Sequence, residues 1–192
     1  SAPSQRHGWI VDPLDGTTNF SVGLPIWAIS MARLQDGQPF EAIIDVPPLH
    51  QRYVAVRGQG VWRNGEPLLA PGGPRHRCSC ASLCTRSIPV LQKVQRPFPA
   101  KTRMLGVASL NLLGVGLGTM LAALEATPKI WDLAAVWLIL EELGCVIRPL
   151  ADHPFPMKPG APLGEASYPL LAACDEEHYQ RFLPWGQALV SC

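Results

Sequence analysis

The chain has 192 residues, of which 47% are hydrophobic and 16% are charged, and its formal net charge is +1. This composition is typical of a globular protein with a substantial core and argues against a disordered chain. It also argues against strong attraction to nucleic acid or acidic membranes, because that attraction needs a clear basic excess. We therefore expect one good-sized domain or two small ones, with no nucleic-acid and no membrane partner.

The first part of the chain predicts an antiparallel sheet with few helices. Apolar or alternating runs indicate four strands, at residues 9–11, 26–34, 40–46 and 52–57. Residues 35–38 (QDGQ) are typical of a hairpin turn, and Asn64-Gly65 is a strong hairpin signal further along. These signals assign residues 9–70 to the sheet.

The remainder of the chain predicts alternating helices and strands. The expected elements are a strand near 80–84, a helix near 89–95, strands at 145–149 and 168–174, and a short terminal helix at 175–182. The clearest helix lies in WDLAAVWLILEELG, where apolar residues recur at helical spacing from Leu133 to Leu143 and Gly144 ends the helix. A site for a small ligand is expected where the two parts of the chain meet.

Residues 104–124 are uncharged and long enough to cross a membrane. Four glycines and Asn111 interrupt this run, and its second half has no basic flank. We favour a buried helix that breaks at Gly114–Gly118 and is followed by a short buried strand. The first residues, SAPSQRHGW, contain no apolar signal core, and the six cysteines form no CxxC pair, so we expect a cytoplasmic protein.

The segment WIVDPLDGTTNF carries the first candidate for chemistry. Asp12 and Asp15 flank a tight turn and can point at one region that the Leu14 carbonyl also faces, and Mg²⁺ prefers such oxygen ligands. The amides of Gly16 and Thr17, at the start of a helical turn, can donate to phosphate oxygens. A purely structural turn is the alternative, because Asp, Pro and Gly are common turn residues.

Asp132 is the second candidate, at the start of the clearest helix. An aspartate there either caps the helix or aims its carboxylate at a metal from the far side of a cleft. At this point WIVDPLDGTTNF together with WDLAAVWLILEELGC resembles the two signature segments of the inositol monophosphatase family of Mg²⁺-dependent, lithium-sensitive phosphatases. GVASLNLLGVGLGTMLAALEA resembles the family segment between them, and GVWRNGEPL resembles the family's hairpin.

The resemblance implies a layered α-β-α-β-α sandwich that mixes α+β and α/β character and is commonly a homodimer. It implies Mg²⁺-dependent hydrolysis of a small phosphate ester, such as inositol monophosphate or a sugar phosphate, with two or three metal ions activating a water. Fructose bisphosphate, a nucleotide 3′-phosphate and histidinol phosphate are alternative substrates.

The resemblance also implies roles for individual residues. Metal ligation falls to the carboxylates of Asp12, Asp15 and Asp132 and to the carbonyl of Leu14. Phosphate binding falls to Gly16 and Thr17, with Thr17 also positioning the attacking water, and substrate contacts fall to Ala108 and Glu125. The catalytic groups are then Asp12, Asp15, Thr17 and Asp132.

The chain departs from the family pattern upstream of Asp12. A Gly-Glu-Glu or Gly-Glu-Asp segment that supplies a further metal-binding acid has no counterpart, nor do the helices before it. We therefore expect a fragment, with residues 1–75 forming the antiparallel part around DPLDGT and residues 76–192 the α/β part around WD. Val107 stands where relatives often have Ser or Thr, which narrows sugar recognition, and Cys145 replaces a common Gly.

Two other functional hypotheses remain. One is a family member that keeps the fold without catalysis and serves in assembly or regulation. The other is a nucleic-acid binder that uses six basic residues, namely Arg75, Arg77, Arg86, Arg96, Lys101 and Arg103, although no aromatic residues alternate with them. The histidines are scattered and expected at the surface: His7, His50, His76, His153 and His178.

Overall fold

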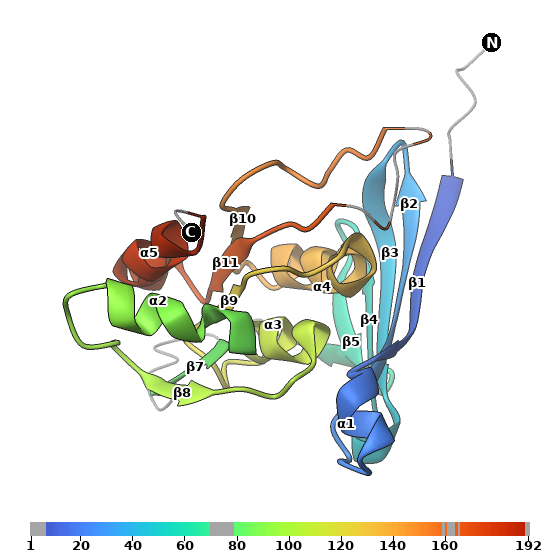
Figure 1. Ribbon diagram of the computed structural model, residues 1–192. Coiled ribbons are helices and arrows are strands. Elements are labelled where there is room, and N and C mark those ends of the chain that lie inside the picture. The colour runs from blue at the N-terminus through green and yellow to red at the C-terminus, as the bar shows by residue number, and fades with distance from the viewer. Residues whose placement is uncertain (1–6, 70–78, 159, 161–163, 165, 191–192) are drawn as a thin grey trace.

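The computed structural model describes residues 7–69, 79–158, 160, 164 and 166–190, and it arranges them in alternating layers of sheet and helix (Figure 1). The first sheet has six strands, each antiparallel to the next. They are β1 (His7–Asp15), β2 (Ala28–Gln35), β3 (Gln38–Val46), β4 (Gln51–Val56), β5 (Gly60–Arg63) and β6 (Glu66–Leu68). The short helix α1 (Thr17–Ser21) follows β1, and a 3₁₀ turn, Pro47–Leu49, follows β3.

Two tight turns set the register of this sheet. Asp36 and Gly37 have φ of 50° and 80°, and Asn64 and Gly65 have φ of 52° and 87°. Positive φ at both central residues is the geometry that joins twisted antiparallel strands directly. Along β2, buried and partly buried residues alternate, so one face of the sheet looks into the molecule. The antiparallel sheet predicted for residues 9–70 is confirmed over its described part, up to residue 69.

The second sheet is mixed, in the order β10-β11-β9-β7-β8. Its strands are β7 (Cys80–Leu83), β8 (Lys101–Arg103), β9 (Ala122–Glu125), β10 (Val146–Pro149) and β11 (Leu170–Ala173). β7 runs parallel to β8 and β9, whereas β11 is antiparallel to both β9 and β10. The strands predicted near 80–84, 145–149 and 168–174 are confirmed.

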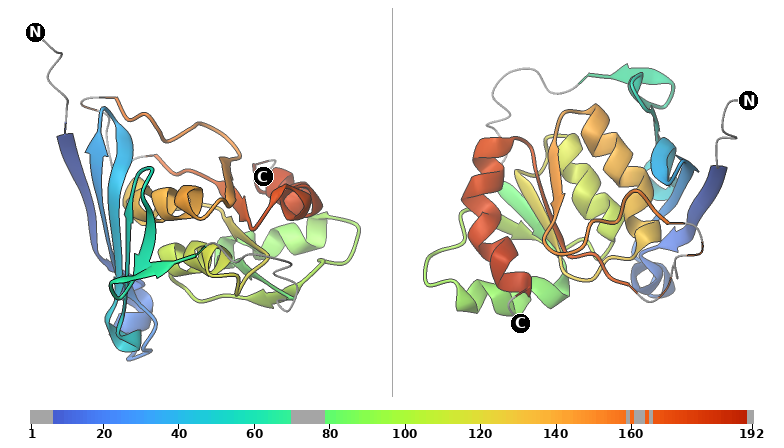
Figure 2. Two further views of the ribbon diagram at one scale, coloured as in Figure 1. Left: turned by 180° about the vertical axis from the view of Figure 1, so that it is seen from behind. Right: turned by 90° about the horizontal axis from the view of Figure 1, so that it is seen from above.

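Helices lie between the sheets and outside the second one (Figures 1 and 2). The inner pair is α3 (Ala108–Gly116) and α4 (Ile130–Glu142), and the outer pair is α2 (Ile88–Lys93), preceded by a 3₁₀ turn at Thr85–Ser87, and α5 (Glu176–Val190). α4 contacts strands β1 to β5, while α3 contacts β7 and β9. The described residues thus form successive β, α, β and α layers of the expected sandwich.

The helix α4 forms the centre of the core. Each residue from 133 to 140 is at most 3% exposed. A helix that is apolar on all sides needs cover on all sides, which the two sheets and α3 supply. This packing holds the first turn of α4, with Asp132, in a fixed position against the first sheet.

The last helix is longer than predicted. The expected helix spanned residues 175–182, whereas α5 extends from Glu176 to Val190 with Pro184 inside it. Proline disfavours a helix interior because it removes a hydrogen bond and crowds the preceding turn. Phe182 and Trp185 are nevertheless buried on the same side, with ring centroids 5.4 Å from that of Phe98. We attribute the extension past Pro184 to this aromatic packing.

The buried helix and strand that we favoured for residues 104–124 are confirmed. The segment forms the buried helix α3, which ends at Gly116, and then the buried strand β9. In the described part of the chain, no helix has the length and apolar character needed to cross a membrane. The boundary expected between residues 75 and 76 lies outside the described residues.

Candidate metal centre

Asp12 and Asp15 lie at the end of β1, on either side of an irregularity in its pairing with β2. Asp12 pairs with Ser30 and Asp15 pairs with Ala28, so two residues of β1 face a single residue of β2. Side chains three positions apart normally point to opposite faces of a strand, but one extra residue restores the alternation. Ser30 and Ala28 are both buried on the inner face. Both aspartates therefore point inward, toward α4.

The first turn of α4 brings Asp132 to the same place. The Ser30 hydroxyl donates to the Trp131 carbonyl at 3.2 Å, which ties this turn to β2. Asp132 Oδ2 accepts the backbone N–H of Lys129 at 2.7 Å. Asp132 thus has the capping role that one reading assigned to it, and its carboxylate also faces the other two aspartates.

The three carboxylates converge. One oxygen from each of Asp12, Asp15 and Asp132 lies within 4.8 Å of the other two. Burial raises the pKa of Asp15, although its Oδ2 accepts the Ser109 N–H at 2.8 Å, and the charge of Asp12 raises it further. Burial, with repulsion from both neighbours, raises the pKa of Asp132 to about 7. Such a group of like charges stores repulsion that a cation would relieve.

This donor set fits a hard divalent cation. All three groups offer carboxylate oxygens, the ligands that Mg²⁺ prefers, and no sulfur or imidazole is among them. Leu14 lies between the two aspartates of β1, and its N–H donates to Asp12 Oδ1 at 3.0 Å. The metal-binding role of the Leu14 carbonyl stays a prediction.

The loop after β1 is shaped by glycine. Gly16 has φ of 90°, and a Cβ at this position would lie 2.7 Å from Val107 Cγ2. Only glycine meets both conditions without strain. The Asn19 amide then donates to the carbonyls of Ile26 and Leu105, at 2.9 and 2.7 Å. The loop that carries the predicted phosphate-binding residues is therefore fixed to its neighbours on two sides.

A cavity of about 610 Å³ opens beside the aspartates. Among its lining residues are six of the eight predicted site residues, namely Asp15, Gly16, Thr17, Ala108, Glu125 and Asp132. Ala108 begins α3 and lies next to Ser109, whose amide binds Asp15. Asp12 joins the group through its carboxylate. The structure thus brings together groups from β1, α1, α3, β9 and α4.

Glu125 is the most deeply buried acid of the cavity, at 3% exposure. Its Oε1 accepts a hydrogen bond from Asn111 Nδ2 at 2.7 Å. Burial raises the pKa of Glu125 to about 8 despite this bond, and the charges of Asp15 and Asp132 add to the effect. The carboxyl group therefore binds a proton more readily than an exposed glutamate does, and in its protonated form it can donate a hydrogen bond as well as accept one.

Several lining residues were not predicted from the sequence. In the sequence Asn111 only interrupts an apolar run, yet in the fold its amide holds Glu125. Arg86 is one of a group of basic residues in the sequence, whereas in the fold it lines the cavity and donates to Thr127 Oγ1 at 2.9 Å. No local signal marks these side chains, because they meet the site only after the second sheet has formed.

Comparison with known proteins identifies the family. The sequence model of the inositol monophosphatase family matches residues 1–181. The chain belongs to this family. It is 36% identical over 160 residues to a putative Nus factor SuhB of Neisseria meningitidis, covering 77% of this chain and 60% of that protein. It is 34% identical over 152 residues to an inositol-1-monophosphatase of Mesorhizobium japonicum, covering 72% and 55%.

A solved structure supports the layered fold. Inositol monophosphatase II from Staphylococcus aureus matches 98% of this chain and 74% of its own, with a TM-score of 0.78 at 22% identity. The family and the sandwich fold inferred from the two signature segments are confirmed. The chain spans 55–60% of the length of the two curated relatives described above.

Proposed function

We propose that this inositol monophosphatase family chain carries the catalytic centre of a Mg²⁺-dependent phosphomonoesterase that acts on a small phosphate ester such as inositol monophosphate. The observation that carries the proposal is the convergence of Asp12, Asp15 and Asp132 at the edge of a cavity. The likeness to a protein named as an inositol-1-monophosphatase supports the substrate class.

The aspartates would hold the metal. Asp12, Asp15 and Asp132 offer oxygens from both sides of the cleft, and the Leu14 carbonyl is expected to add one more. Bound Mg²⁺ supplies a lowered pKa for water and neutralisation of phosphate charge. The repulsion among the three carboxylates makes them receptive to such a cation.

The loop at Gly16 and Thr17 would hold the phosphate. α1 begins at Thr17, and the first amides of a helical turn have no partners within the helix, so they are available to phosphate oxygens. The exposed Thr17 hydroxyl would orient the attacking water. The water gives up a proton as its oxygen bonds to phosphorus, the bond from phosphorus to the ester oxygen breaks, and the leaving alkoxide takes up a proton to become the alcohol.

The remainder of the cavity suits a small polyol. Its volume of about 610 Å³ falls in the ordinary range of small-molecule sites. Ala108 and Glu125 line it and would contact the organic part of the substrate. Val107, which is 1% exposed and packs against Gly16, offers no hydroxyl for recognition.

The test is phosphate release with and without Mg²⁺, in this chain and in any longer protein that contains it. Inositol monophosphate is compared with fructose bisphosphate, a nucleotide 3′-phosphate and histidinol phosphate. Asp132→Asn should lower the Mg²⁺-dependent rate at least about a hundredfold. Asp152→Asn, which changes an exposed carboxylate outside the cavity, should leave it unchanged. Near wild-type turnover in Asp132→Asn would contradict the proposal.

A second candidate is a non-catalytic role in assembly or regulation. The likeness to a protein named as a putative Nus factor favours it. This candidate predicts that Mg²⁺ binding and the fold are intact while no ester of the panel is hydrolysed. Calorimetric titration with Mg²⁺, run beside the phosphate assay, separates the two candidates. A homodimer, expected from the family resemblance, stays a prediction.

A further inference from the structure

A second group of potential metal ligands lies away from the cavity, where β11 leads into α5. Cys174, Asp175 and His178 each offer a donor atom, and these atoms lie within 4.8 Å of one another. Of the five histidines, His178 was expected at the surface, but it is only 6% exposed, so that prediction was wrong. Its neighbour in the group, Cys174, is 4% exposed and carries a thiol.

Local structure holds these three side chains together. The Cys174 N–H donates to the Leu121 carbonyl at 3.0 Å, which continues the pairing of β11 with β9. Asp175 Oδ1 accepts the backbone N–H of His178 at 2.8 Å and lies 2.7 Å from its Nδ1. The Cys174 thiol lies 3.6 Å from Asp175 Oδ2. The thiol and the imidazole therefore contact different oxygens of the same Asp175 carboxylate.

The carboxylate of Asp175 is ionised and reachable. Its side chain is 48% exposed, whereas that of His178 is 8% exposed. Burial opposes ionisation, but hydrogen bonds from the backbone and ring of His178 outweigh it and lower the pKa of Asp175. The adjacent Glu176 is paired with Arg148 at 2.7 Å. Asp175 thus supplies negative charge on the solvent-exposed side of the three residues.

Helix capping alone explains only part of this arrangement. An aspartate before the first turn of a helix is a common cap, and it needs only a backbone N–H as its partner. The buried imidazole and thiol on the same carboxylate add nothing that a cap requires. Sulfur, imidazole nitrogen and carboxylate oxygen are, however, the three donor types that bind Zn²⁺.

We propose that Cys174, Asp175 and His178 form a second metal site, which takes a thiophilic divalent cation such as Zn²⁺ with water as a further ligand. Zn–ligand bonds of about 2.0–2.3 Å place the donors of a tetrahedral site roughly 3.5 Å apart. Donors already within 4.8 Å need only small side-chain movements to reach that spacing. The thiol loses its proton to solvent as the metal–sulfur bond forms.

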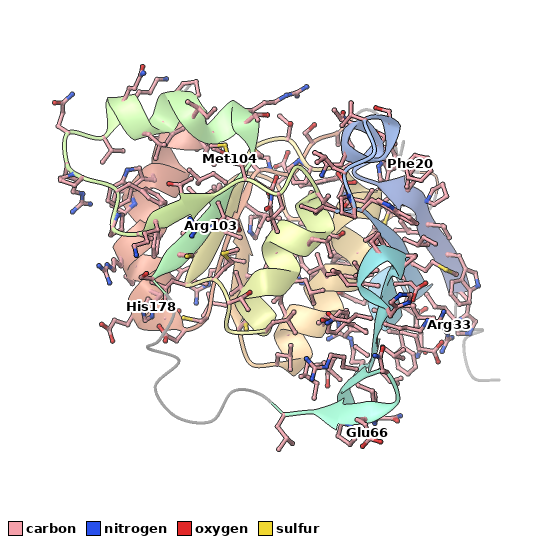
Figure 3. All side chains as sticks on the ribbon, turned by 90° about the horizontal axis from the view of Figure 1, so that it is seen from below. Phe20, Arg33, Glu66, Arg103, Met104 and His178 are labelled. Carbon is pink, nitrogen blue, oxygen red and sulfur yellow. The ribbon has the colours of Figure 1, made fainter. Side chains whose placement is uncertain are left out.

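This site is distinct from the carboxylate centre. Ala173, beside Cys174, pairs with Ala122 at one end of β9, whereas Glu125 of the cavity is at the other end. Three strand steps separate these ends by about 10 Å. In Figure 3, His178 at the start of α5 lies well away from Met104, which lines the cavity. The two centres also differ in chemistry, because sulfur disfavours Mg²⁺.

Cobalt provides the test, since Co²⁺ bound to a thiolate gives a near-ultraviolet sulfur-to-metal charge-transfer band that an all-oxygen site lacks. The folded chain is titrated with Co²⁺ and then with Zn²⁺ as competitor. We expect one equivalent of the band in the wild type and in Asp132→Asn, and its loss in Cys174→Ser. Cys145→Ser, which removes a half-buried thiol outside the group, should keep the band.

Asp175→Asn separates ligation from capping. Asparagine caps helices as well as aspartate does but is a much poorer metal ligand, so the variant should fold like the wild type. Its Zn²⁺ affinity should fall by more than about tenfold. A charge-transfer band that survives in Cys174→Ser, or unchanged Zn²⁺ affinity in both Asp175→Asn and His178→Gln, would overturn the proposal. Circular dichroism of each variant verifies that it is folded.

Discussion

Carboxylates in two regions of this molecule meet opposite electrostatic surroundings. At the candidate metal centre, Asp132 lies beside Asp12 and Asp15, and burial with their repulsion raises its pKa to about 7. On the first sheet, both oxygens of Glu41 accept hydrogen bonds from Arg33 at 2.8 Å, and these bonds lower the pKa of Glu41.

The difference shows where the fold leaves charge uncompensated. The pair of Arg33 and Glu41, whose side chains are 21% and 41% exposed, is complete within the fold, and salt weakens the attraction between its charges. The three aspartates have their chain partners in backbone amides, and their charges repel one another. The repulsion among these aspartates lowers the stability of the protein when no cation is bound. Functional sites commonly have such a cost, and it indicates an arrangement for binding.

The largest effect is expected from Asp12→Asn, which removes one of the three clustered carboxylates. Removing one carboxylate takes away a metal ligand, so Mg²⁺-dependent turnover should fall at least about a hundredfold. The same change relieves repulsion, so the metal-free variant should unfold at a temperature no lower than the wild type does. Thermal unfolding in a chelator, beside the phosphate assay, measures both. A variant that loses activity only because it unfolds would show that the centre is structural.

Gly16→Ala tests the loop that the centre depends on. The new Cβ would meet Val107 Cγ2 at 2.7 Å in a left-handed backbone, and strain of this kind costs about 1–3 kcal/mol. Gly144→Ala is the matched control, because Gly144 has φ of 67° but a Cβ added there would meet no atom within 4 Å. Chemical denaturation should show a larger loss for Gly16→Ala. Adding Val107→Ala should restore part of the difference, and equal losses at both glycines would contradict the contact.

Glu125→Gln tests whether the buried carboxyl group of Glu125 makes the stability of the protein depend on pH. The pKa of Glu125 rises from an ordinary 4.5 to about 8 on folding, chiefly through burial. The folded state therefore binds a proton that the unfolded state releases, and its stability declines as pH rises from about 4.5 to 8. Glutamine cannot titrate, so the variant should show a flatter decline. Unfolding midpoints from pH 5 to 9 measure the slope, and equal slopes would contradict the assignment.

The spacing of residues in one short segment predicted much of the candidate metal centre. Asp12, Asp15, Gly16 and Thr17 lie within six residues of one another, and their residue types already indicate oxygen ligands and a phosphate-binding turn. The pairing irregularity that turns both aspartates inward was not predictable, because it depends on the partners Ser30 and Ala28 across the sheet. Period and turn signals predict a strand, whereas its register against a neighbour is a property of the fold.

Packing between helices and strands accounts for the other differences. The role of Asn111 needs β9 beside α3, which places its amide 2.7 Å from Glu125. The burial of His178 needs α5 to pack on the second sheet, and helix length was underestimated at Pro184. In each case a residue with an ambiguous local signal takes its environment from the packing of its helix against another element, which the local sequence does not specify.

The smallest expected effect comes from Glu41→Gln, on the paired side of the comparison. The variant keeps the shape of the side chain and removes the charge that faces Arg33. Because an amide has only one acceptor oxygen, it also removes one of the two hydrogen bonds from Arg33. Because the pair is partly exposed and salt screens its attraction, the unfolding temperature should change less than in Gly16→Ala, and the change should shrink further in high salt. Asp12→Asn should respond in the opposite direction, gaining most at low salt where carboxylate repulsion is strongest. If both variants lost stability equally, the two regions would not differ in the way their geometry indicates.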